Sequence, residues 1–94
     1  MALTKALRAW REAYKEALAV RPQAEVFDLA FAKLADRTGI QLRLNVSGDT
    51  VRAEAMQPSG SLVESVTHSP DTLTVRLRAI EEALSQTYRK DRWR

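Results

Sequence analysis

The chain has 94 residues, of which 45% are hydrophobic, and it contains no cysteine. A chain of this length supports one hydrophobic core, and the lack of cysteine excludes disulfides, thiolate metal sites and a thiol nucleophile. The formal net charge is +3, and basic residues gather at both ends of the chain, so binding to nucleic acid is one function that the composition permits.

The first twenty residues predict an amphipathic helix over residues 2–20. Its apolar residues recur at steps of four and three, which places them on one side of a helix. This stripe consists of Leu3, Leu7, Trp10, Tyr14 and Ala17. The opposite, solvent-facing side carries Lys5, Arg8, Arg11, Glu12 and Lys15. Because charges interrupt the segment, we expect neither a signal peptide nor a membrane span, and a cytoplasmic location is predicted.

A second helix is predicted over residues 22–38. Pro22 suits the first helical position, where its missing N–H has no partner to lose, and Gly39 suits the left-handed position that ends a helix. The main apolar stripe consists of Phe27, Phe31 and Leu34. Val26 and Leu29 lie away from this stripe, so the helix is apolar on a second side, which we interpret as an oligomer interface.

Alternating apolar and polar residues predict strands over residues 40–46 and 50–56. The residues between them, Ser47, Gly48 and Asp49, are typical of a tight hairpin. After a loop at residues 57–61, a third strand is predicted over residues 62–68. The result is a small three-stranded antiparallel sheet.

Residues 69–84 fit two patterns. Ser69 as N-cap and Pro70 in the first turn favour a helix over residues 70–90. Its core side would consist of Leu73, Leu77, Ile80, Leu84 and Tyr88. The alternative is a fourth strand over residues 72–77, which the β-branched residues there favour. Either way, the sequence predicts a single compact α+β domain with its helices on one face of the sheet.

From Pro22 onward, the predicted order of helix, three strands and helix resembles the double-stranded RNA-binding domain in topology. That family carries a lysine-rich cluster at the start of its last helix, which grips phosphates. The corresponding residues of this chain are Ser69, Pro70, Asp71 and Thr72. Because Asp71 repels phosphate, the sequence does not predict membership of that family.

Residues suited to catalysis are few. His68 is the one imidazole, and its nearest acids, Glu64 and Asp71, do not have the spacing of metal ligands. Glu81 and Glu82 are neighbours on a helix and project in different directions, so they do not form a carboxylate pair. We therefore expect no catalytic residue, metal ligand, cofactor or small-molecule ligand, and a protein that is not an enzyme.

Two functions follow as hypotheses. The first is a non-catalytic protein-interaction module whose partner is a second copy of the chain, as a homodimer, or another protein. Its anchors would be Val26, Leu29, Tyr88 and Trp93. The alternative is a basic accessory domain that binds nucleic acid through phosphate contacts. Those contacts would come from Arg8, Arg11, Lys15, Arg89, Lys90, Arg92 and Arg94.

Overall fold

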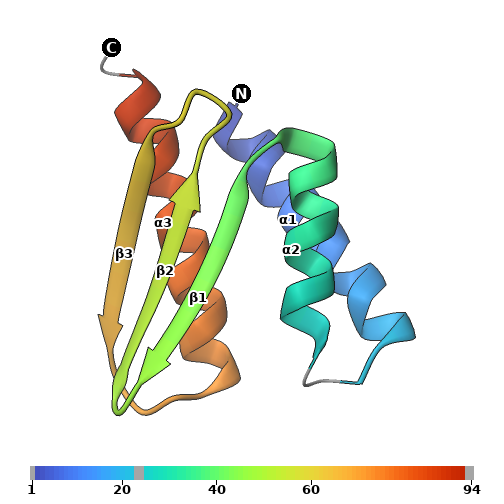
Figure 1. Cartoon of the computed structure of the whole chain (residues 1–94), viewed down its shortest axis with the longest axis vertical. Helices are drawn as coiled ribbons and strands as arrows, with labels where there is room; N and C mark the ends of the chain where they lie inside the picture. Colours follow the sequence, from blue (N-terminus) through green and yellow to red (C-terminus); the bar gives the residue numbers. More distant parts are fainter. Residues whose placement is uncertain (1, 23–24, 93–94) are drawn as a thin grey trace.

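The fold is an α+β domain, as the sequence predicts. The structure is a computed structural model that describes residues 2–22 and 25–92, and side chains over residues 5–22 and 25–86. The elements, in chain order, are α1 (Ala2–Val20), α2 (Val26–Thr38), β1 (Gln41–Ser47), β2 (Thr50–Met56), β3 (Leu62–His68) and α3 (Leu73–Arg92) (Figure 1).

The three strands form an antiparallel sheet in the order β1-β2-β3. Gly48, with a φ of 60°, lies in the tight turn between β1 and β2. The loop between β2 and β3 is a second tight hairpin, closed by bonds from Gly60 N–H to the Gln57 oxygen and from Gln57 N–H to the Ser61 oxygen. Gly60 has a φ of 92°, which is the left-handed conformation that a three-residue hairpin loop requires at this position.

The helices cover one face of the sheet. α3 packs against β2 and β3, α2 lies beside β1, and α1 packs extensively on α2 and less on α3 (Figure 1). The other face of the sheet carries exposed residues, among them Arg52, Met56 and Val66. We call it the open face.

The core lies between the helices and the covered face of the sheet. Its largest fully buried side chains are Trp10, Leu34, Ile80, Leu84, Val26 and Val51. The central strand faces the helices with Val51, Ala53 and Ala55. α3 adds the small residues Ala79 and Ala83, so this helix can lie close to the sheet.

The start of α2 differs from the prediction. The helix begins at Val26, not at residue 22, and ahead of it Glu25 N–H bonds the Pro22 oxygen at 2.9 Å. Its end is as expected: Gly39 has a φ of 77°, and its N–H bonds the Ala35 oxygen. The first strand is displaced by one residue, to Gln41–Ser47.

The start of α3 also differs. Ser69 does not cap the helix, because it lies four residues before the first helical residue, Leu73; its N–H extends the sheet by bonding the Asp49 oxygen at 3.0 Å. Thr72 is the N-cap, and its Oγ1 accepts a bond from Val75 N–H at 3.2 Å. The helix therefore spans Leu73–Arg92, and the alternative of a strand over residues 72–77 is wrong. Leu73, expected in the core, is 39% exposed, and Val75 is buried in its place.

Candidate interaction surface between α1 and α3

α1 is fixed firmly to α2. The rings of Trp10 and Tyr14 on α1 pack against those of Phe27 and Phe31 on α2, with Trp10 and Phe31 centroids 5.7 Å apart. Such aromatic pairs stabilise a contact by about 0.5–1.5 kcal/mol beyond their buried area. The ring cluster therefore fixes the position of α1 on α2.

Ion pairs reinforce this α1–α2 contact. The Glu16 carboxylate on α1 accepts a hydrogen bond from Arg37 Nη2 and lies 3.6 Å from Lys33 Nζ. The hydrogen bond from Arg37, and the positive charges of Arg37 and Lys33, lower the pKa of Glu16 below its ordinary value of 4.5. Glu16 is therefore a charged partner of α2.

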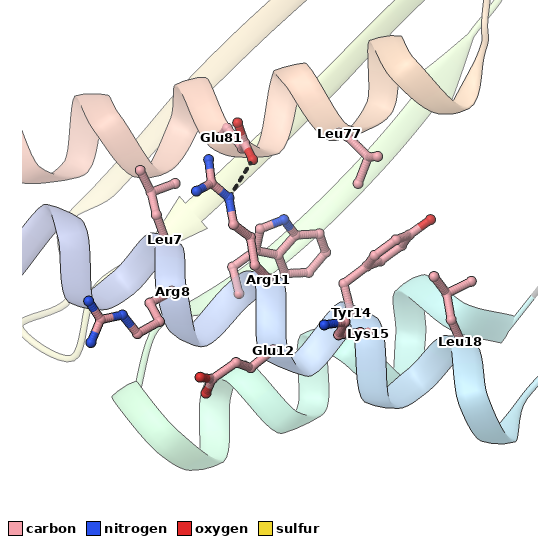
Figure 2. Close-up of a pocket in the computed structure, with 10 residues that line it drawn as sticks. Leu7, Arg8, Arg11, Glu12, Tyr14, Lys15, Leu18, Leu77 and Glu81 are labelled. Carbon is pink, nitrogen blue, oxygen red and sulfur yellow. Dashed lines mark hydrogen bonds and ion pairs between the residues drawn. The ribbon is translucent and has the colours of Figure 1, made fainter.

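A groove of about 640 Å³ lies between α1 and α3. Its apolar walls consist of Leu7, Trp10, Tyr14, Leu18 and Leu77. Leu7, Tyr14 and Leu77 are half-buried, and Leu18 is 47% exposed. Figure 2 shows Leu77 projecting from α3 towards α1, opposite Tyr14 and Leu18. The groove is therefore an apolar hollow that opens to solvent beside Leu18.

Charged side chains border the groove. Arg11 Nε lies 3.4 Å from Glu81 Oε2, and this ion pair bridges the two helices between Leu7 on one side and Tyr14 and Leu77 on the other (Figure 2). Arg8 and Lys15 are exposed and make no ion pair within the part of the chain that the structure describes. Because these two cations are seven residues apart, they lie on the same side of α1, two turns apart, with Glu12 between them. The border is therefore basic on balance.

The predicted protein-interface residues are not brought together on this surface. Val26 is 1% exposed and belongs to the core, so its expected role as a surface anchor is wrong. The reason is that α2 lies between α1 and β1, and its second apolar side is buried within the domain. Leu29 is half-buried and packs against the same core. The side chain of Tyr88 and residue Trp93 lie outside the described residues.

Of the residues predicted to contact phosphates, the structure describes the side chains of those on α1 and not of those at the end of the chain. Arg8, Arg11 and Lys15 all border the groove. Arg8 also lines a hollow on the side of α1 towards α2, together with Lys5 and Arg37. The remaining side chains, those of Arg89, Lys90 and Arg92, and residue Arg94 lie outside the described part of the chain. Arg89, Lys90 and Arg92 belong to α3, whose carboxyl end lies at the same end of the molecule as the beginning of α1 (Figure 1).

The open face of the sheet carries a buried acid. Glu54 is 9% exposed, and its carboxylate accepts hydrogen bonds from Arg43 Nη2 at 3.1 Å and Asn45 Nδ2 at 2.9 Å. This cross-strand network accounts for the opposite charges of Arg43 and Glu54 on the two strands. Glu64 lies opposite Glu54 on β3 and is exposed.

His68 lies at the end of β3 on the open face. Its Nδ1 is 3.5 Å from Thr50 Oγ1 on the neighbouring strand. Within the described residues, no group of three or more histidine, aspartate or glutamate side chains is placed to hold a metal ion. None of the helices over the described ranges has the length and apolarity needed to cross a membrane.

The sequence pattern alone gave only part of this surface. Leu7, Tyr14 and Leu18 follow a helical period on α1, so their common side could be predicted. The contribution of Leu77 and Glu81 could not, because it depends on the position of α3 relative to α1.

Comparisons of the chain with known protein families, curated proteins and solved structures find no match.

Proposed function

We propose that the chain is a small non-catalytic protein-interaction module and that the groove between α1 and α3 binds its partner. The observation that carries this proposal is the solvent-open apolar hollow formed by Leu7, Tyr14, Leu18 and Leu77 beside a buried Trp10. Apolar grooves between helices commonly bind one face of an amphipathic helix.

The charges around the groove select the kind of partner. Arg8 and Lys15 have no carboxylate partner among the described residues, whereas Arg11 is paired with Glu81. An occupant with acidic residues beside its apolar stripe would pair with these two cations. We therefore propose an amphipathic helical segment of another protein, with apolar residues on one face and acidic residues along its flank.

A panel of synthetic peptides tests this proposal. One peptide carries leucines on one helical face and glutamates along the flank, and a matched peptide carries lysines in place of the glutamates. Fluorescence anisotropy of labelled peptides should show binding of the acidic peptide, weakening as salt rises because exposed charges are screened. Equal binding of the basic peptide would contradict the proposed charge selection.

Two protein variants localise the binding. Leu18→Glu places a charge in the groove and is expected to weaken binding of the acidic peptide roughly tenfold or more. Val20→Glu is the matched control, because Val20 is also exposed near the end of α1 but does not line the groove. Equal losses in both variants would exclude the groove as the binding site.

Nucleic-acid binding is the alternative proposal, and the three cations of α1 support it. Phosphate binding requires clustered positive charge, whereas Glu12 and Glu81 share this surface and Arg11 is already paired. The test is retention of the chain by mixed-sequence DNA and RNA at low salt. Steeply salt-dependent retention that Arg8→Ala and Lys15→Ala reduce would favour this alternative over the peptide groove.

A further inference from the structure

β3 forms a free edge of the sheet. At the other edge, β1 continues directly from α2 and lies beside it, whereas no described element lies beyond β3 (Figure 1). An edge strand offers backbone N–H and C=O groups that can pair with a further strand.

The hydrogen bonds at the two ends of the β2–β3 ladder show which groups are available. Gln57 N–H bonds the Ser61 oxygen, and Ser69 N–H bonds the Asp49 oxygen. Bonded and non-bonded pairs alternate in an antiparallel ladder, so Val63, Ser65 and Thr67 direct their backbone groups towards β2. The backbone groups that point away from the sheet therefore belong to Leu62, Glu64, Val66 and His68.

The same strand carries two buried hydroxyl groups without a partner. Ser65 Oγ and Thr67 Oγ1 are buried, and neither makes a hydrogen bond within the described part of the chain. Both belong to the covered face, which places them towards α3. Leaving a buried hydroxyl unsatisfied is unfavourable, so such groups usually have a partner in the functional state of a protein.

We propose that two copies of this chain associate through β3, in antiparallel pairing around a two-fold axis at Val66. In this register Ser65 of each copy lies opposite Thr67 of the other, as a non-bonded pair whose Cβ atoms approach most closely. Each orphan hydroxyl thereby gains a partner. On the open face Glu64 lies opposite His68 of the second copy, and the two Val66 side chains meet at the axis.

Other registers with the same backbone geometry lose these contacts. An axis at Glu64 brings the two glutamates together, and directly opposed like charges destabilise a strand pair. An axis at Ser65 leaves Thr67 opposite Val63 of the second copy. An axis at Thr67 leaves Glu64 without an opposing residue of β3. Of these registers, the one centred on Val66 places Ser65 opposite Thr67 of the second copy. It also places Glu64 opposite His68 of the second copy.

The helices fit the same arrangement. α3 packs equally against β2 and β3, so its axis lies near the midline between them. With strands about 4.8 Å apart, the two copies of α3 would then lie about 10 Å apart, which is close to the usual distance of packed helices. The flank of α3 opposite Leu77 and Glu81 carries the short residues Val75 and Ala79 and, farther along the helix, the longer residues Glu82 and Gln86.

This self-association goes beyond the proposed peptide groove and rests on different residues. The groove lies on the α1 side of α3 and stays open in the dimer. Failure of one proposal is therefore distinguishable from failure of the other, because Leu18→Glu should leave the dimer intact.

The absence of cysteine makes the register directly testable. Single cysteines are introduced as Val66→Cys, Glu64→Cys and His68→Cys, all on the open face. In the proposed register, the two Cα atoms of residue 66 lie about 5.5 Å apart, within disulfide range, whereas those of residue 64 lie roughly 14 Å apart. Under mild oxidation, Val66→Cys should form a covalent dimer, and the other two variants should do so only when mixed with each other.

A pair of proline variants tests the edge itself. Val66→Pro removes an N–H that points away from the sheet, so the monomer loses no ladder bond while pairing is blocked. Val46→Pro is the matched control on β1, the other edge strand. Ser47 and Thr50 flank the turn as a bonded pair, so the neighbouring residue Val46 directs its backbone N–H away from β2.

Light scattering after gel filtration should give a dimeric mass for the wild-type chain and for Val46→Pro, and a monomeric mass for a folded Val66→Pro. Circular dichroism checks that both variants fold. A monomeric wild-type chain at all concentrations, or cross-linking of Glu64→Cys alone with none of Val66→Cys, would overturn the proposal.

Discussion

Arg37 donates a hydrogen bond from α2 to the carboxylate of Glu16 on α1. The two residues are far apart in the sequence, and this contact joins helices that the aromatic cluster already holds together. The contact is exposed, so it adds modestly to the larger stabilisation by ring packing.

The first prediction concerns the dependence of stability on pH. The pKa of Glu16 in the folded chain lies below its ordinary value of 4.5. The unfolded state therefore binds this proton more readily, so the contact stabilises the fold above about pH 4.5, and its contribution is lost as the pH falls through the folded pKa. Glu16→Gln should lower the free energy of unfolding, measured with urea, at about pH 7, and the difference from wild type should vanish at about pH 2.

Asp36→Asn is the matched control for this experiment. Asp36 is exposed on α2 and makes no ion pair among the described residues. An equal loss of stability in Asp36→Asn at neutral pH would show that the effect of Glu16→Gln is one of general charge and not of the contact with Arg37.

The second prediction concerns the end of α2. A Cβ atom at Gly39 would lie 2.8 Å from Pro58 Cγ, and Gly39 has a φ of 77°. Gly39→Ala should therefore destabilise the fold by the cost of a left-handed residue, about 1–2 kcal/mol, plus a collision with the second hairpin. Gly48→Ala also places alanine at positive φ but has open space around it. Chemical denaturation should show the larger loss in Gly39→Ala, and equal losses would contradict a role for Pro58.

The third prediction concerns the cap of α3. Thr72→Ala removes the bond to Val75 N–H and should cost about 1 kcal/mol of unfolding free energy. Ser69→Ala should change the free energy by less than about 0.5 kcal/mol, because the sheet contact of Ser69 uses its backbone N–H. A larger loss of unfolding free energy in Ser69→Ala than in Thr72→Ala, measured by thermal or urea unfolding, would contradict the assignment of Thr72 as the N-cap.

The fourth prediction concerns the two hydroxyls of β3. In the proposed dimer, Ser65→Ala leaves Thr67 of the second copy without its partner, so the dimer dissociation constant should rise roughly tenfold or more. The double variant Ser65→Ala/Thr67→Val replaces both partners by apolar groups and should restore most of the affinity. Sedimentation at several concentrations measures both constants. A double variant weaker than the single one would contradict the pairing of these hydroxyls.

Much of the fold could be predicted because periodicity in this chain is strong. The stripe through Trp10 and Ala17 fixed α1, and alternation around Val51 and Ala53 fixed the hairpin strands. The starts of α2 and α3 could not be predicted from local signals. Pro22 and Ser69 are both typical of helix starts, but both lie ahead of the helices. The Pro22 oxygen accepts a bond from Glu25 N–H, and Ser69 N–H makes the last bond of the β2–β3 ladder.

The candidate surfaces were harder to predict, because they depend on how distant segments meet. Val26 looks like a surface anchor when α2 is considered alone, and only the position of α2 between α1 and β1 explains its burial. Leu77 enters the groove for the same kind of reason. In the sequence, Ser65 and Thr67 are typical polar residues of an edge strand. Only the position of α3 over β3 explains why their hydroxyl groups are buried.

The central claim is that the groove between α1 and α3 is a binding site for an acidic amphipathic helix. The most direct measurement is a map of amide chemical shifts of the isotopically labelled chain during titration with the glutamate-flanked peptide. We predict that the shifts concentrate at Leu7, Tyr14, Leu18 and Leu77, along the two helices that face the groove. Shifts that concentrate instead on Arg52, Met56 and Val66 of the open face, with the groove unaffected, would contradict the claim.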